Sequence, residues 1–252
     1  MSLTWQMLLI VCPLAFLAGF VDSVAGGGGL ISLPAYYLAG LPTVTAAGTN
    51  KLSTCLGTLA ASGRYLAGHE VNVRAALLAA LGAFPGSWMG TALLKRIPEQ
   101  AIRVMMIAAI PLVAVVVLRR KTLGGQRLTP ERLDMPVSFL IGLSVGFYDG
   151  LIGPGTGTFL ILLFTSLMGM EAVMASGTAK LVNLTSNVAS LLSLLLAGQV
   201  MLLLGLPAAA CGIAGNLLGA NMTIKKGSGF IRTILMVVLT LLLAKMVWDM
   251  VK

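Results

Sequence analysis

Apolar residues in this chain form long stretches separated by short polar connections. No charged residue occurs in positions 1–21, 23–50 or 181–224. Because a helix needs about 20 apolar residues to cross the hydrocarbon core of a membrane, each of these runs can hold at least one crossing. The pattern predicts five apolar segments in each half of the chain: Trp5–Val24, Leu30–Leu41, Val44–Leu66, Val73–Leu94 and Ile102–Leu118, then Val137–Ile152, Thr158–Met168, Ala172–Leu196, Met201–Met222 and Phe230–Val251.

Composition supports a membrane location. Hydrophobic residues make up 58% of the chain and charged residues 10%, whereas soluble proteins carry about 25% charged residues. We therefore expect an all-α integral membrane protein with about 8–10 transmembrane or half-membrane helices. The net charge of +9 lies mostly in short connections, as is typical of cytoplasmic loops beside anionic lipid. Nucleic-acid binding is not expected, because no segment predicts a soluble domain.

The two halves of the chain repeat each other. Gly19–Asp22 recurs as Gly146–Asp149, 127 positions later, and Ala47–Leu52 recurs as Ser176–Leu181, 129 positions later. An internal repeat with interrupted hydrophobic segments is typical of secondary transporters. We therefore divide the chain into a first membrane repeat (1–118), a basic linker expected to be cytoplasmic (119–135) and a second membrane repeat (136–252).

The second segment of each half is too short to span a membrane, and its path decides the symmetry. If it forms a re-entrant hairpin, each half has four crossings and both halves point the same way. If it pairs with its neighbour as one broken helix, or counts as a crossing, the number is odd and the halves are inverted. Transporter precedent favours two inverted repeats.

A glycine-rich block precedes each short segment. Gly26–Gly29 and Gly153–Gly157 should each end a helix, since glycine costs about 1 kcal/mol relative to alanine and Pro154 lacks a backbone donor. The half-helix that follows then starts near the middle of the bilayer, where its positive end favours an anion. Close packing of helices through small residues is the alternative interpretation.

Lys51 and Lys180 stand about eight residues inside long apolar segments. A lysine at the centre of a membrane helix costs about 2.5–3.5 kcal/mol and usually faces a cavity or a partner. Snorkelling of the side chain to the membrane surface is the alternative. We expect both ammonium groups to face one anion pocket. The other predicted substrate-binding residues are Thr49, Asn50, Thr178, Asn183, Asn187, Gly27, Gly28, Gly155 and Thr156.

Asp22 and Asp149 precede the glycine blocks and have two open roles. They could cap a helix or form buried ion pairs with the lysines. Alternatively, one of them could carry a proton, because burial favours the neutral form of a carboxyl group. The sequence does not separate these roles.

These motifs resemble those of the TauE/SafE sulfite exporter family, which includes toluene-sulfonate-uptake permeases. The resemblance rests on Gly19–Asp22 with Ala25–Gly29, on Ala47–Leu52, and on the second-half motifs at 153–157 and 177–180. It implies a multi-pass plasma-membrane permease for sulfur-containing anions. The second copy departs from the first where Ala179 replaces the asparagine at Asn50, so a symmetric anion site is not expected.

The leading hypothesis is a secondary transporter that moves sulfite, sulfoacetate or another organosulfonate by alternating access. An anion channel using the same pocket is the alternative. An enzyme is not expected, because His69 is the single histidine and no nucleophile–base motif accompanies it. No P-loop or paired cysteines occur, so neither a cofactor nor a metal is expected. The expected partners are a small anion and the lipid bilayer; a proton or other coupling ion and a second copy of the chain stay open.

Overall fold

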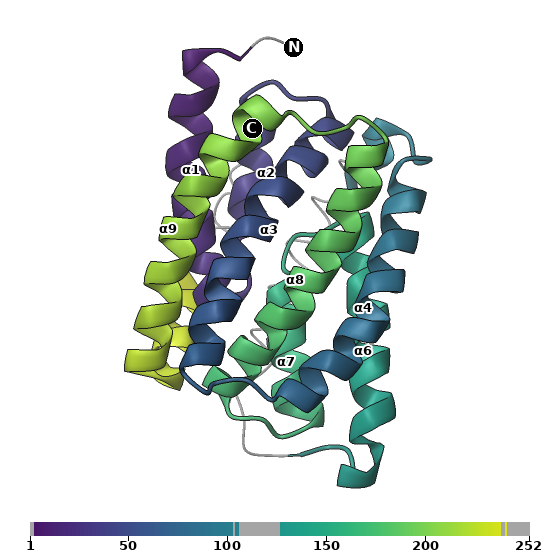
Figure 1. Ribbon diagram of the computed structural model, residues 1–252, viewed down its shortest axis with the longest axis vertical. Helices are drawn as coiled ribbons and strands as arrows, with labels where there is room; N and C mark the ends of the chain where they lie inside the picture. Colours follow the sequence, from purple (N-terminus) through teal and green to yellow (C-terminus); the bar gives the residue numbers. More distant parts are fainter. Residues whose placement is uncertain (1–2, 103, 106–126, 238–239, 241–252) are drawn as a thin grey trace.

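The computed structural model describes residues 3–102, 104–105, 127–237 and 240, and all regular elements in these ranges are helices (Figure 1). Most of the predicted segments Ile102–Leu118 and Phe230–Val251, and part of the predicted linker, lie outside the described residues. The elements are α1 Trp5–Ala25, α2 Gly29–Leu38, α3 Thr43–Ala67, α4 Val73–Leu94, the 3-10 turn η1 Glu131–Leu133, α6 Asp134–Leu151, α7 Thr156–Leu167, α8 Ala172–Leu196, α9 Leu202–Lys226 and a short apolar helix Ser228–Val237.

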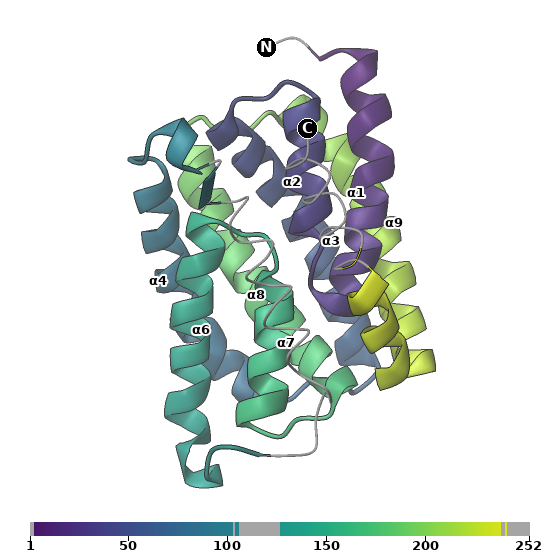
Figure 2. The same ribbon diagram turned by 180° about the vertical axis from the view of Figure 1, so that it is seen from behind.

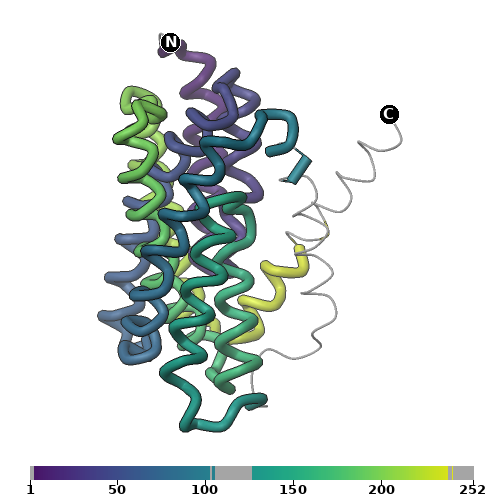
Figure 3. The backbone as a smooth tube through the Cα atoms, turned by 90° about the vertical axis from the view of Figure 1, so that its right-hand side faces the viewer, coloured from purple at the N-terminus to yellow at the C-terminus, as the bar shows by residue number. Residues whose placement is uncertain are grey.

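The lengths of the helices confirm the predicted all-α membrane fold. Among the described helices, α1, α4, α8 and α9 are long and apolar enough to cross a membrane. α2 and α7 have 10 and 12 residues, so each covers about half that distance. Figure 3 shows the Ser228–Val237 helix leaving the end of α9 and running obliquely to the other helices.

In each half, the last long helix among the described residues packs with the other half. α4 lies along α6 and α8, while α9 lies along α1 and α3 (Figures 1 and 2). Packing therefore groups the helices differently from the sequence repeats. The division of the chain into those repeats stays a prediction. We call α1, α2, α3 and α9 the first bundle, and α4, α6, α7 and α8 the second bundle.

Glycines bring these paired helices close together. A Cβ atom on Gly86 of α4 would lie 2.3 Å from the carbonyl oxygen of Leu143 in α6. A Cβ atom on Gly215 of α9 would lie 2.0 Å from the carbonyl oxygen of Phe16 in α1. Contacts this short leave room only for glycine. Small residues at helix interfaces stabilise membrane bundles, because backbones that approach closely gain van der Waals contact.

Corresponding helices of the two halves run in opposite directions. In Figures 1 and 2, α1 and α3 run from the end of the molecule that carries the N-terminus, whereas α6 and α8 run toward that end. An inverted repeat requires these directions, and the inversion itself stays a prediction.

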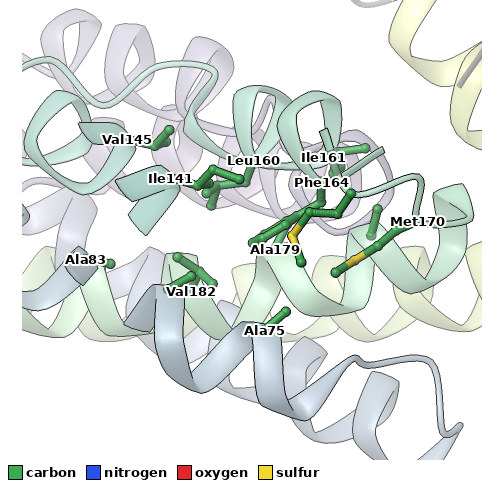
Figure 4. Packing of buried hydrophobic residues seen from close by; sticks show 13 residues of the cluster. Ala75, Ala83, Ile141, Val145, Leu160, Ile161, Phe164, Met170, Ala179 and Val182 are labelled. Carbon is green, nitrogen blue, oxygen red and sulfur yellow. The ribbon is translucent and has the colours of Figure 1, made fainter. Parts of the chain in front are cut away.

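Apolar clusters pack the helices both within and between the bundles. In the second bundle, the core joins α4, α6, α7 and α8 through Ala83, Ile141, Phe164 and Val182 (Figure 4). Large apolar side chains also cover the outside, where Leu81 is 67% exposed. Serine, threonine, asparagine and four charged side chains are buried instead. An apolar exterior around a polar interior suits a lipid environment.

Candidate functional site

Both predicted helix breaks are present, and they touch each other. α1 ends at Ala25 and α2 begins at Gly29; α6 ends at Leu151 and α7 begins at Thr156. Gly26 has φ = 75°, and a Cβ atom there would lie 2.1 Å from the carbonyl carbon of Gly157. Glycine is required at Gly26 for both reasons, because left-handed backbone disfavours other residues.

Two buried ion pairs cross between the bundles beside these breaks. Lys51 Nζ in α3 lies 2.6 Å from Asp149 Oδ2 in α6. Lys180 Nζ in α8 lies 2.6 Å from Asp22 Oδ2 in α1. Each lysine thus pairs with the aspartate of the other repeat, and the four charges sum to zero. Side-chain exposure is at most 10% for all four residues, so water screens these pairs weakly.

Asp149 is held by three donors. Besides the ammonium group of Lys51, the hydroxyl of Ser186 donates to Oδ2 at 2.7 Å and the hydroxyl of Thr156 donates to Oδ1 at 2.8 Å. Lys51 also donates to Asn187 Oδ1 at 2.9 Å. Hydrogen bonds to an ionised group are stronger than neutral ones, so this network fixes the position of the Asp149 side chain.

Asp22 has a single donor. Among the residues that the structure describes, Lys180 alone donates to its carboxylate, and Oδ1 accepts no hydrogen bond. The repeat explains the difference, because glycine replaces both hydroxyl residues. Gly29 stands 127 positions before Thr156, and Gly57 stands 129 positions before Ser186.

A small central cavity lies between the bundles, with a volume of about 40 Å³. The first residues of α2 and α7, Gly29 and Thr156, line it, so the positive ends of both half-helices reach this space. Its polar wall also contains Asp22, Asn50, Lys51, Thr54, Asp149, Asn183 and Asn187. Asn50 is 5% exposed and its Oδ1 has no hydrogen-bond partner among the described residues. An unpaired buried polar atom is costly, so this oxygen favours a bound donor or water.

Several predicted residues lie away from this cavity. Lys180 is fully buried against Asp22 and does not line it, nor do Gly27, Gly28 and Gly155. Gly28 instead allows close packing, since a Cβ atom there would lie 2.4 Å from Asp22 Cβ. Gly155 has φ = 82° and caps the start of α7.

Thr49 and Thr178 also lie outside the cavity lining, where they anchor the starts of α9 and α4. The hydroxyl of Thr49 accepts the N–H of Met201, and the hydroxyl of Thr178 accepts the N–H of Asn72, both at 3.0 Å. Met201 and Asn72 are the residues that precede α9 and α4. The two threonines therefore have the same structural contact in both halves.

Sequence reasoning missed Ser186 and a second, smaller cavity. Ser186 lies between Asn183 and Asn187 on α8, and the spacing of three and four residues along an apolar helix could have shown this polar face. The second cavity, of about 10 Å³, is lined by Asp22, Ser32, Ser53, Thr54 and Asn216, together with small residues. Asn216 is 2% exposed, and its Oδ1 has no partner among the described residues.

The sequence matches one protein family and several curated relatives. Residues 11–246 match the family described as sulfite exporter TauE/SafE. A probable membrane transporter protein of Haemophilus influenzae is 35% identical over 249 residues, covering 99% of this chain and 98% of that protein. The probable membrane transporter protein YfcA of Escherichia coli K12 is 32% identical over 254 residues, covering 98% of this chain and 94% of that protein. A match of this extent places the chain in the sulfite exporter TauE/SafE family of membrane transporters.

Proposed function

We propose that this protein is a secondary transporter of the plasma membrane for a small sulfur-containing oxyanion such as sulfite, sulfoacetate or another organosulfonate. The family supports transport, and the central cavity supports an anion. The observation that carries the proposal is the meeting of two half-helix N-termini beside Lys51 in one buried space. Helix N-termini and ammonium groups both favour negative charge.

The size of the cavity agrees with a small solute. A water molecule needs about 10–15 Å³ of such volume, so 40 Å³ has room for about three waters or a compact oxyanion. A larger organosulfonate requires the bundles to move apart. Both ion pairs bridge the bundles, so any rocking of one bundle against the other changes these contacts. This arrangement supports alternating access.

The test is uptake of labelled sulfite and sulfoacetate into liposomes that contain the purified protein. We expect saturable uptake with counterflow, and at least a tenfold lower rate in Lys51→Ala and Lys180→Ala. Lys225→Ala is the matched control, because Lys225 is an exposed lysine in the last turn of α9. Unchanged transport in both the Lys51→Ala and Lys180→Ala variants contradicts the site, and large single-channel currents favour the anion channel instead.

A further inference from the structure

The charge at the centre of the protein limits how an anion can bind. Two lysines and two aspartates already neutralise each other there. An added anion leaves a buried negative charge without a partner, and such charges are strongly destabilising. At least one carboxylate must therefore become neutral when the anion enters. A proton that binds to a carboxylate oxygen accomplishes this, and the charge of the paired ammonium group then offsets one negative charge of the anion.

The hydrogen bonds distinguish the two carboxylates. Neutralising Asp149 weakens three charge-assisted hydrogen bonds, from Lys51, Ser186 and Thr156. Neutralising Asp22 weakens one, from Lys180. We propose that Asp22 is the proton-binding residue of this transporter and that each anion crosses together with a proton held there. The inference rests on the proposed function and names its coupling ion.

Two cavities with polar walls adjoin Asp22. Asp22 and Thr54 line both the central cavity and the second cavity, so these two residues separate the spaces. The second cavity has room for about one water molecule, and the unpaired Oδ1 of Asn216 offers that water an acceptor. Ser32 and Ser53 add hydroxyl groups to the same wall. A hydrated carboxylate can exchange a proton.

The charged surroundings of Asp22 are few. Lys180 faces it from α8, and Lys51 of α3 and Asp149 of α6 share the central cavity with it. The phenol of Tyr65 in α3 donates to the carbonyl oxygen of the adjacent Ser23 at 2.9 Å. In the two cavities that Asp22 lines, the described residues of α2, α7 and α9 are all neutral. The charge of Asp22 thus depends mainly on Lys180 and on the occupant of the cavity.

Infrared spectroscopy of the purified protein tests the proton site without any substrate. We expect the carbonyl band of a protonated carboxylic acid to titrate with pH in the wild type and to disappear in Asp22→Asn. The band should persist in Glu131→Gln, because Glu131 is an exposed carboxylate outside the cavity, with a side chain 87% exposed. A titrating band that persists in Asp22→Asn and disappears in Asp149→Asn overturns the assignment.

Transport supplies the second measurement, with labelled sulfoacetate as the probe. Its acid groups are ionised near neutral pH, so a proton taken up must bind to the protein. A pH gradient should drive accumulation at least tenfold in the wild type, with a pH dye inside the liposomes reporting proton entry. Asp22→Asn should abolish both the accumulation driven by the pH gradient and the entry of protons. Accumulation that ignores the pH gradient in the wild type overturns the inference and leaves the proposed function standing.

Two further variants distinguish loss of the proton site from misfolding of the protein. Asp22→Asn leaves Lys180 without its partner, so the double variant Asp22→Asn/Lys180→Met removes both charges and should lack the titrating band as well. Asp22→Glu retains a carboxyl group and should retain both the band and proton entry. If the Asp22 band titrates but the wild-type protein does not move sulfoacetate, the substrate assignment is wrong and the proton site stands.

Discussion

The surroundings of Asp149 and Asp22 differ although their backbones correspond. Both residues end a broken helix, both lie beside a second break, and both pair at 2.6 Å with a lysine from the other repeat. Asp149 has two additional hydroxyl donors, and glycine stands at both equivalent positions around Asp22. The comparison teaches that a repeat can preserve its architecture while it gives the two copies of one residue different chemistry.

Other repeated contacts remain equal in the two halves, so the asymmetry is local. Thr49 and Thr178 accept the same kind of backbone N–H at the start of the exchanged helices. A Cβ atom on Gly48 or on Gly177 would lie 1.9 Å from a carbonyl oxygen, that of Gln199 or Glu70. These contacts fix the scaffold, whereas the unequal contacts surround the charges at its centre.

Removing either carboxylate group should give the largest loss of stability. Asp149→Ala should lower the free energy of unfolding by about 3–5 kcal/mol, because it leaves Lys51 buried without a partner. The variant also removes the hydrogen bonds that Thr156 and Ser186 donate to the carboxylate, so its cost should exceed that of Asp22→Ala. Thermal unfolding of both variants in detergent micelles measures the difference. Equal losses would show that the hydroxyl groups do not distinguish the two sites.

Removing the hydroxyl group of Ser186 should make the surroundings of Asp149 resemble those of Asp22, which lacks this donor. Ser186→Ala should cost about 1.5–3 kcal/mol, the range for a hydrogen bond to a charged group. Thr185→Ala is the matched control, because the neighbouring hydroxyl of Thr185 donates only to the carbonyl oxygen of Leu181 in its own helix. Unfolding of the two variants in the same micelles gives the comparison. A Ser186→Ala variant as stable as the control would remove the basis for the asymmetry.

Substitution of either of two equivalent glycines by alanine should lower the free energy of unfolding equally, unlike removal of the two carboxylates. Gly86→Ala and Gly215→Ala occupy equivalent positions of the repeat, and each added Cβ meets a backbone carbonyl oxygen at 2.0–2.3 Å. We expect each to cost about 1–3 kcal/mol, the usual range for overpacking. Gly63→Ala in α3 is the control, since a Cβ there meets no atom within 4 Å. Clearly unequal losses would extend the asymmetry to the scaffold.

Asn50 should affect binding more than stability. Its repeat counterpart is Ala179, and its side chain lines the central cavity, where the amide N–H groups can donate to an anion. Asn50→Ala should change the unfolding temperature little while weakening sulfoacetate binding about tenfold, which corresponds to about 1.4 kcal/mol. Titration calorimetry on purified protein measures the affinity. Unchanged affinity together with a large loss of stability would make Asn50 a packing residue.

Much of the fold could be predicted from the sequence because membrane helices are specified locally. Long charge-free runs predicted α1, α8 and α9, and the glycine blocks predicted where the helices break. Helix ends differ from the predictions by a few residues, as for α7, which begins at Thr156 and not at Thr158. The partner of each helix was not predicted, since glycine spacing shows that a helix packs closely without showing against which neighbour.

The sequence by itself determined the helical membrane architecture, the repeat, and the presence of two lysines and two aspartates at corresponding places. Local hydropathy and backbone preferences are sufficient for these features. Only the tertiary structure decided that each lysine pairs with the aspartate of the other repeat and that Lys180 does not line the cavity. The hydrogen bond from Ser186 to Asp149, which has no counterpart at Asp22, was likewise decided there. These features depend on contacts between residues about 100 positions or more apart, or on side-chain direction across a helix interface, and no local pattern encodes either.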